Sequence, residues 1–280
     1  MIPAEFDYAA PASLDEALSL LNQHGEDAKI LAGGHSLIPL MKLRLARPGM
    51  LIDLRRIGGL RGIRQDGDRL RIGAMTTHAE IASSSLVTQQ APALAQAAHE
   101  IGDRQVRSRG TIGGSLAHND PAADLPAVML ALDAWMVIRS SAGERVVGAG
   151  DFFRGLLETA LEPNELLTEV RVKVSPRSAY AKFPNPASHY ALAGVAAAVE
   201  GNGTVSAARI GVTGAAPSAY RASGAEAALA GKALSSDAIE AASAATRDGR
   251  EMLTDIHASA EYRAALVQIL TKRALQSIAG

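Results

Sequence analysis

Two pairs of adjacent glycines, each beside a hydroxyl side chain, are the residues of this chain best suited to hold a ligand. The first lies in 32–36 (Ala-Gly-Gly-His-Ser) and the second in 111–115 (Thr-Ile-Gly-Gly-Ser). Because glycine lacks a Cβ, neighbouring backbone N–H groups can converge on an anion, and a serine or threonine adds a further donor. Two such loops suit the two phosphates of a dinucleotide such as FAD. The alternative is that both pairs only form tight turns.

Other known ligand and metal patterns are missing from the sequence. Neither glycine pair fits G-x-G-x-x-G, and the chain has no G-x-x-x-x-G-K-[ST], so Rossmann and P-loop sites are not indicated. The chain has no cysteine, which excludes cysteine-ligated iron–sulfur clusters, disulfides and a cysteine nucleophile. Its 7 histidines are scattered without an H-E-x-x-H pair, so we expect no metal site. Redox chemistry would therefore need an organic cofactor.

Composition indicates an ordinary globular protein. The 280 residues are 48% hydrophobic, which is enough to build two domains with cores of their own. A net charge of −1 without a basic tract argues against a nucleic-acid partner. No apolar run approaches the roughly 18 residues of a membrane span, and residues 1–7 lack the pattern of a signal peptide. We expect a cytoplasmic protein with no transmembrane segment.

The elements around the first glycine pair place it at the end of a strand. A capping box at 13–16 begins a helix that Gly25 ends, and 29–32 then forms a short buried strand. We expect a helix over 37–46, ended by Pro48, and a second strand over 50–54. Ligands of α/β units commonly bind at such strand ends.

The elements around the second pair alternate in the same way. A hairpin over 60–74 turns at Asp66-Gly67, and a second capping box at 77–80 begins another helix. Further elements are expected at 92–101, at 124–132, and in a hairpin of 135–138 with 145–147. Three arginines, Arg104, Arg107 and Arg109, precede the second glycine pair. They form either a solvated face or a surface that meets a partner or balances phosphate charge.

The character of the chain changes near residue 176. A hairpin of 191–199 and 204–212 is followed by three alanine-rich helices, near 224–230, 237–246 and 260–278. We therefore predict two domains, 1–176 and 177–280.

Together, these segments resemble the FAD-binding medium subunits of molybdenum hydroxylases, the family that includes those of aerobic carbon monoxide dehydrogenase and xanthine dehydrogenase. The segments that carry the resemblance are 1–3, 31–39, 72–77, 110–115, 120–126 and 163–168. The resemblance implies an α+β fold, with an FAD-binding domain of the vanillyl-alcohol-oxidase (PCMH) type over 1–176. This domain would have subdomains of about 1–56 and 57–176, followed by an α+β CO-dehydrogenase-flavoprotein-like C-terminal domain over 177–280.

The resemblance also implies which residues bind FAD. The pyrophosphate and ribityl chain would be wrapped by Leu31, Ala32, Gly33, Gly34, His35, Ser36, Leu37 and Ile38, and by Thr111, Ile112, Gly113, Gly114 and Ser115. Ile101 would pack near the adenine, and Asp124 would hydrogen-bond the cofactor. Leu167 and Lys182 would approach the flavin ring, with Tyr190 over it. The residues alone leave open an N-cap role for Asp124, a surface position for Lys182 and a core position for Tyr190. No residue is assigned a catalytic or metal-binding role.

The implied function is that of an FAD-carrying electron-transfer subunit. It would receive electrons from 2Fe-2S clusters of a small subunit, beside a large molybdopterin subunit in a dimer of heterotrimers, and pass them to an external acceptor. The alternatives are a free-standing flavin oxidoreductase of the same fold and a non-catalytic nucleotide-binding module. The segment 182–188 is less basic than in carbon monoxide dehydrogenases, which weakens CO as the substrate and leaves heterocycles and aldehydes open. The absence of cysteine disfavours the benzoyl-CoA reductase branch.

Overall fold

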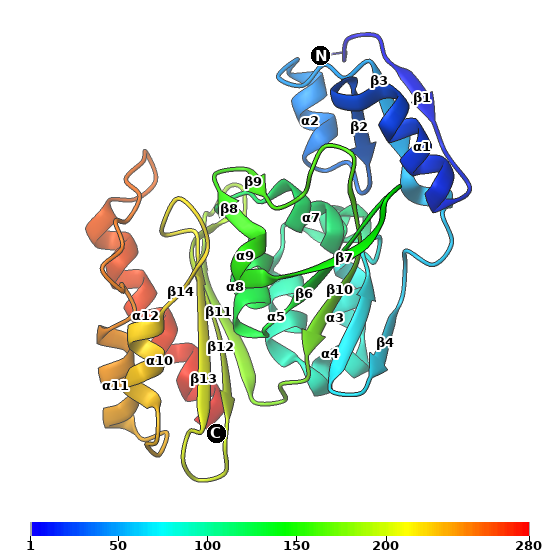
Figure 1. Cartoon of the computed structure of the whole chain (residues 1–280). Coiled ribbons are helices and arrows are strands. Elements are labelled where there is room, and N and C mark those ends of the chain that lie inside the picture. The colour runs from blue at the N-terminus through cyan, green and yellow to red at the C-terminus, as the bar shows by residue number, and fades with distance from the viewer. Residues whose placement is uncertain (1, 280) are drawn as a thin grey trace.

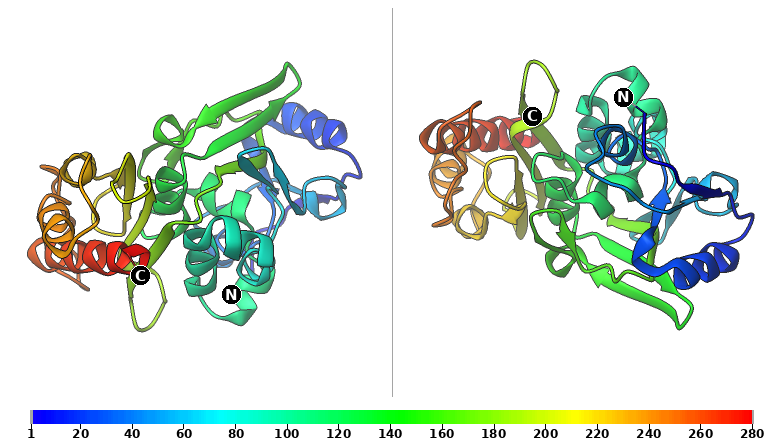
Figure 2. Two further views of the ribbon diagram at one scale, coloured as in Figure 1. Left: turned by 90° about the horizontal axis from the view of Figure 1, so that it is seen from below. Right: turned by 90° about the horizontal axis from the view of Figure 1, so that it is seen from above.

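The computed structural model describes residues 2–279, which form three units in sequence order (Figure 1). The middle unit separates the N-terminal unit from the C-terminal unit, as the two views of Figure 2 both show. Within the described range, no helix has both the length and the apolar character needed to cross a membrane.

The N-terminal unit is a small parallel sheet of order β1-β3-β2 with two helices. Its elements are β1 (Asp7–Ala9), α1 (Leu14–His24), β2 (Ala28–Leu31), α2 (Leu37–Lys42) and β3 (Met50–Asp53), with 3-10 turns at Gly25–Asp27 and Leu54–Arg56. The capping box predicted at 13–16 is half formed: Ser13 accepts a hydrogen bond from the Glu16 N–H, but the Glu16 carboxylate accepts from the Ala12 N–H instead of that of Ser13. The buried face of α1 packs Ala17, Leu18 and Leu21 against the sheet. The sheet therefore presents the end of β2, and the first glycine pair after it, to the middle unit.

The predicted length of the second helix is wrong. The sequence suggested 37–46, but α2 ends at Lys42. Arg44 takes a positive φ of 59°, and the Leu45 N–H then donates to the Leu40 carbonyl oxygen at 2.9 Å. The left-handed residue turns the chain out of the helix before Pro48 can end it.

The middle unit is built on an antiparallel sheet of order β4-β5-β10-β6-β7, with helices covering its core face. Its elements are β4 (Ile63–Asp66), β5 (Arg69–Gly73), α3 (His78–Ser83), α4 (Ser85–Gln90), α5 (Pro92–Glu100), α6 (Arg104–Arg109), α7 (Ile112–His118), α8 (Leu125–Ala131), β6 (Trp135–Ser140), β7 (Gly143–Gly148), α9 (Ala149–Phe152), β8 (Phe153–Gly155), β9 (Glu158–Thr159) and β10 (Leu166–Lys173). The predicted capping box is present at the start of α3, where Thr77 and Glu80 satisfy each other's backbone N–H groups. Helix α7 lies where this unit meets the N-terminal unit (Figure 1), and the Arg109 carbonyl oxygen at the end of α6 lies against Gly33 of the N-terminal unit.

The C-terminal unit is a four-stranded antiparallel sheet of order β11-β12-β13-β14 with three helices. Its elements are β11 (Ser178–Pro184), β12 (Ala191–Glu200), β13 (Ala207–Thr213), β14 (Tyr220–Arg221), α10 (Ser223–Leu229), α11 (Ser236–Ala244) and α12 (Ala260–Ala279). Helix α12 packs on β11 and β12, and α5 and α8 of the middle unit pack against the same sheet. Because both faces are covered, β12 is buried along nearly its whole length and consists mainly of alanine and valine.

Arg263 of α12 joins this helix to the sheet from inside the protein. It is 3% exposed, and its Nη1 donates to the carbonyl oxygens of Leu192 and Gly214, while its Nη2 pairs with Asp255 at 2.6 Å. Arg263→Met leaves these buried acceptors without a donor, so we expect the free energy of unfolding to fall by roughly 2–4 kcal/mol. Urea denaturation measures the change. Arg273→Met, on the exposed face of the same helix, should stay within about 0.5 kcal/mol of the unmodified protein, and equal effects would contradict this role.

Candidate functional site

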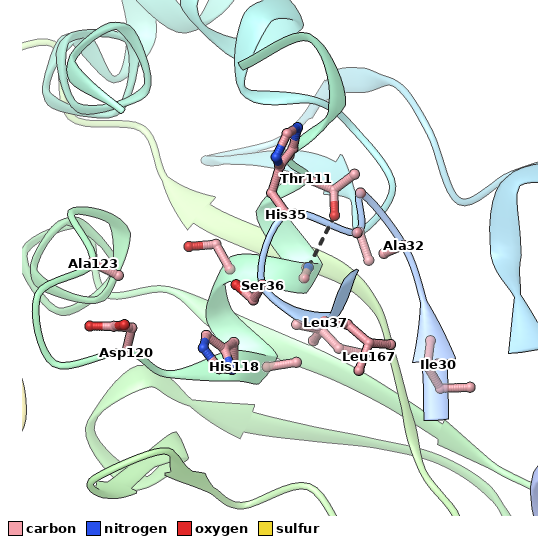
Figure 3. Close-up of a pocket in the computed structure, with 18 of the residues that line it drawn as sticks. Ile30, Ala32, His35, Ser36, Leu37, Thr111, His118, Asp120, Ala123 and Leu167 are labelled. Atoms are coloured by element: carbon pink, nitrogen blue, oxygen red, sulfur yellow. Dashed lines mark hydrogen bonds between the residues drawn. The ribbon is translucent and has the colours of Figure 1, made fainter. Parts of the chain in front are cut away.

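A cavity of about 620 Å³ lies where the three units meet (Figure 3). Its walls come from the segment after β2, from α7 and the loops around it, and from the segment that precedes β12. Most of the predicted FAD residues line it; the exceptions are Leu31, Ile38, Ile112 and Lys182. The structure therefore brings together both glycine pairs, Ile101, Asp124, Leu167 and Tyr190, which are spread over the sequence.

The first glycine pair offers a run of backbone donors to this cavity. From Gly33 to Leu37, no backbone N–H has a hydrogen-bond partner among residues 2–279. Gly34 has a φ of 77°, a left-handed conformation that favours glycine, and Gly33–Leu37 all line the cavity. Consecutive backbone N–H groups of this kind form an anion-binding concavity. The sequence predicted such a run of donors here, and phosphate binding by this segment stays a prediction.

The two glycine pairs lie against each other. A Cβ on Gly33 would overlap the carbonyl oxygen of Arg109 and lie 2.8 Å from the Gly110 Cα. A Cβ on Gly114 would lie 3.6 Å from the Ala32 Cβ. Glycine at 33 thus allows the first segment to lie directly on the backbone that leads into the second, as the neighbouring positions of Ala32 and Thr111 in Figure 3 illustrate.

The expectation that the second pair forms a loop with converging donors is wrong. Gly113 and Gly114 lie in the first turn of α7, and their N–H groups are already used. The Gly113 N–H donates to the Ala74 carbonyl oxygen at 2.8 Å, and the Gly114 N–H donates to the Thr111 hydroxyl at 3.1 Å (Figure 3). A Cβ on Gly113 would lie 2.7 Å from the same Ala74 oxygen. This pair lets α7 pack closely, while the hydroxyl-bearing residues Thr111 and Ser115 face the cavity.

Asp124 lies at the wall of the cavity in a buried polar cluster. Its carboxylate accepts a hydrogen bond from the Tyr180 hydroxyl at 2.5 Å and pairs with the Lys182 ammonium at 2.8 Å. Burial raises the pKa of Asp124 above its usual value, and the neighbouring Lys182 charge opposes this shift. Burial, together with the Asp124 charge, also raises the pKa of Tyr180 well above its usual value. Asp124 occupies the N-cap position of α8, but its side chain makes no capping hydrogen bond and bonds Tyr180 and Lys182 instead.

Lys182 is not at the surface and Tyr190 is not in the core, so both alternatives that the sequence left open are wrong. The Lys182 side chain is 1% exposed and is not a surface lysine; it lies behind Asp124 and does not line the large cavity. Lys182 therefore contacts the carboxylate that lines the cavity rather than the cavity itself. Tyr190 is 45% exposed, so it is not a core residue and stands at the rim of the cavity.

Sequence reasoning missed several residues that line the cavity: Met75, His78, His118, Asp120, Ser188 and His189. His118 and Asp120 come shortly after the second glycine pair in the sequence, and both are labelled at the cavity in Figure 3. Met75 and His78 lie in and just after the segment 72–77 that carried the family resemblance. The sequence therefore pointed to this segment as part of the site. It could not show which side chains turn inward, because that depends on the contact between Thr77 and Thr111, two residues far apart in the sequence.

His78 is buried and its Nδ1 has no hydrogen-bond partner within the described part of the chain. Burial, together with the charges of His35 and Arg107, lowers its pKa to about 4. The folded state therefore holds a neutral imidazole that the unfolded chain would protonate below a pKa of about 6.5. Stability is then full above pH 6.5 and falls as the pH drops toward 4.

We expect this single group to remove up to about 3 kcal/mol from the free energy of unfolding between pH 7 and 4. The measurement is urea denaturation at several pH values, with His78→Asn beside the unmodified protein. The asparagine variant should lose much less stability over this range. A parallel pH dependence in both proteins would contradict the assignment.

Two models of known protein families together match nearly the whole chain. Residues 4–174 match the model described as the FAD binding domain in molybdopterin dehydrogenase, and residues 178–278 match the CO dehydrogenase flavoprotein C-terminal domain. The chain belongs to the family of FAD-binding medium subunits of molybdenum hydroxylases. The resemblance seen in the sequence is thereby confirmed, and so is the predicted α+β fold of an FAD-binding domain with a flavoprotein C-terminal domain.

Individual relatives are similar over their full length. The chain is 45% identical to the carbon monoxide dehydrogenase medium chain of Hydrogenophaga pseudoflava, covering 99% of this chain and 98% of the relative. It is 42% identical to the nicotine 6-hydroxylase medium subunit of Paenarthrobacter nicotinovorans, with 96% and 95% covered. A solved structure of the Hydrogenophaga pseudoflava carbon monoxide dehydrogenase, lacking the Mo-pyranopterin moiety, superposes with a TM-score of 0.95 at 46% identity, with 99% and 98% covered.

The cavity of this FAD-binding medium subunit fits the cofactor of its family. FAD needs hydrogen-bond donors for its phosphates, and the unpaired N–H groups between Gly33 and Leu37 supply them. Gly33 lets this segment lie against the backbone of Arg109 and Gly110, which brings its donors to the same cavity as Thr111 and Ser115. The cavity of about 620 Å³ falls within the usual range for cofactor sites.

Proposed function

We propose that this chain is the FAD-carrying electron-transfer subunit of a molybdenum-containing hydroxylase or dehydrogenase. In this role it receives electrons from 2Fe-2S clusters of a small subunit and passes them to an external acceptor. A large molybdopterin subunit oxidises the substrate, and the complex is a dimer of such heterotrimers. The observation that supports the role most directly is the run of unpaired N–H groups facing the cavity at Gly33–Leu37, in a chain of this family.

The residues of the cavity would divide the binding of FAD among them. The N–H groups of Gly33–Leu37 would hold phosphate, each charge-assisted hydrogen bond contributing about 1.5–3 kcal/mol. The hydroxyls of Thr111 and Ser115 would add donors. Ile101 and Leu167 would pack on the ring systems, and Tyr190, at the rim, would cover the flavin.

Bound FAD supplies the ability to accept and release electrons one or two at a time. The contribution of this chain is to hold the cofactor, to exclude water on the side of Leu167 and to place Asp124 at the cavity wall. This function requires no nucleophile from the chain, and we assign none.

The substrate of the complex is not determined by this chain. One relative is named a carbon monoxide dehydrogenase medium chain and another a nicotine 6-hydroxylase medium subunit, at similar identity. A medium subunit of one architecture thus occurs in complexes with chemically different substrates. We propose that the large subunit determines the substrate and that this chain transfers the resulting electrons to the external acceptor.

The test is purification of the tagged chain from cells that express it with its natural partners. The proposal expects a yellow protein with flavin absorption bands, together with stoichiometric iron and molybdenum in the co-purified chains. Flavin without iron and molybdenum would favour the free-standing oxidoreductase. A colourless preparation would contradict FAD binding and favour a nucleotide-binding module that does not turn over.

A further inference from the structure

A second cavity lies on the far side of the Asp124 cluster. Its volume is about 430 Å³, and its polar lining includes His99 and Glu100 near the end of α5 and Tyr180 and Lys182 of β11. Asp124 lines the large cavity, whereas Tyr180 and Lys182 line the second one. The cluster of bonded side chains therefore lies between the two cavities, with Asp124 at the large one and Tyr180 and Lys182 at the second.

The connection between the cavities is continuous and buried. The Lys182 Nζ donates to Asp124 Oδ2 at 3.0 Å and to the Glu100 carbonyl oxygen at 3.0 Å, so it contacts the wall of the second cavity and the carboxylate at the same time. Asp124 is 4% exposed, Tyr180 is 8% exposed and the Lys182 side chain is 1% exposed. Because so little of these side chains meets bulk water, a proton that moves through this cluster passes from one side chain to the next.

We propose that Asp124 and Lys182 carry protons between the second cavity and the FAD cavity, and that Tyr180 is a positioning residue for Asp124. The inference rests on the proposed function, because reduction of a flavin takes up protons as well as electrons. Asp124 lines the large cavity together with two other acids of the middle unit, Asp120 and Glu165, and it is the one that pairs with Lys182.

The proton movement balances without any change in electrons. The Lys182 ammonium gives one proton to the Asp124 carboxylate across the existing hydrogen bond. The neutral Asp124 carboxyl then gives its proton to an acceptor in the large cavity and becomes a carboxylate again. The Lys182 amine takes a proton from solvent at the second cavity. One proton crosses, and the cluster returns to its starting state.

The charges around Asp124 suit this exchange. Lys182 and Tyr180 of β11 face it directly, Glu100 of α5 acts on it from the second cavity, and Asp120 precedes it on its own segment. Burial raises the pKa of Asp124 and Lys182 lowers it, which brings the charged and neutral carboxyl closer in free energy than in water. A group with balanced states both accepts and releases a proton readily.

The experiment follows proton uptake, rather than turnover, in the purified complex. The flavin is reduced with dithionite in a stopped-flow instrument while a pH-indicator dye records protons taken from solution. Asp124→Asn keeps an oxygen that can accept from Tyr180 but cannot carry a proton. We expect the complex to retain its FAD while proton uptake slows by roughly a hundredfold. Added formate, a small diffusible acid, should restore much of the rate.

Two further variants separate the roles. Tyr180→Phe should retain uptake but move its pH midpoint upward, because the Tyr180 hydrogen bond lowers the pKa of Asp124. Glu200→Gln removes a carboxylate from the same sheet that pairs with Lys173 and Arg209 and lines neither cavity, so it should leave uptake unchanged. A merely structural Tyr180 would alter stability without moving the midpoint.

Two outcomes would overturn the inference: unchanged proton uptake in Asp124→Asn, or loss of FAD from this variant, which would make Asp124 an anchor rather than a proton carrier. An unmodified complex without flavin would instead contradict the proposed function.

Discussion

Gly33→Ala should release FAD from the complex while the three units stay folded. The added Cβ would overlap the Arg109 carbonyl oxygen and lie 2.8 Å from the Gly110 Cα, both backbone atoms that cannot move aside independently. The first glycine segment must then shift away from α7, and the N–H groups of Gly33–Leu37 no longer face the cavity in their present arrangement. Losing two charge-assisted hydrogen bonds costs about 3–6 kcal/mol, so we expect FAD affinity to fall at least about a hundredfold.

The measurement is the ratio of bound flavin to protein, read from the visible spectrum after gel filtration and checked by release of FAD on denaturation. Gly58→Ala is the matched control, because a Cβ at this position meets nothing within 4 Å. It should retain a full complement of flavin. Equal FAD content in the two variants would show that the approach of the two segments is not needed for binding.

The sequence predicted well those features that depend on local chemistry. Ser13 and Thr77 begin helices by capping them, and the turn at Asp66-Gly67 joins β4 to β5, as their residue types indicated. The N–H groups of Gly33–Leu37 have no partner within residues 2–279, as expected of a run of donors, and their role in binding FAD stays a prediction.

Features that depend on distant partners could not be predicted in this way. The donors of Gly113 and Gly114 are used because Ala74 and Thr111 stand beside them, and the Ala74 contact is set by the tertiary fold. The two adjacent glycines therefore suggested a phosphate-binding loop, whereas in the structure they allow α7 to pack closely against Ala74. The strand β10 was not predicted either, since it pairs with β5 and β6 from far along the chain.

The pairing of Lys182 with Asp124 was a further non-local feature. The sequence assigned both residues to one cofactor, through the family resemblance, but contained nothing that placed one behind the other. Burial of two opposite charges has an energetic consequence that does not depend on FAD. Removing one partner leaves the other charged in a region of low dielectric, which is costly.

Lys182→Met should therefore lower the free energy of unfolding by roughly 3–5 kcal/mol at pH 7. The buried Asp124 carboxylate would keep its Tyr180 hydrogen bond at 2.5 Å but lose its only close cation among the residues described. Urea denaturation of the isolated chain measures the change. Lys272→Met, which breaks an exposed pair with Glu240, is the matched control and should cost less than about 1 kcal/mol.

The pH dependence of this loss distinguishes a stranded charge from a simple loss of packing. Without Lys182, the folded-state pKa of Asp124 rises further above its unfolded value, since the cation no longer opposes burial. An acid with a raised folded pKa is stabilised below its unfolded pKa and loses that stability as the pH rises through the folded pKa. The cost of Lys182→Met should thus shrink between pH 7 and 5, by at most about 1.4 kcal/mol per pH unit. The double variant Asp124→Asn, Lys182→Met should regain most of the stability at pH 7, because it buries no charge. A pH-independent cost with no recovery in the double variant would mean that Lys182 stabilises the fold by packing alone.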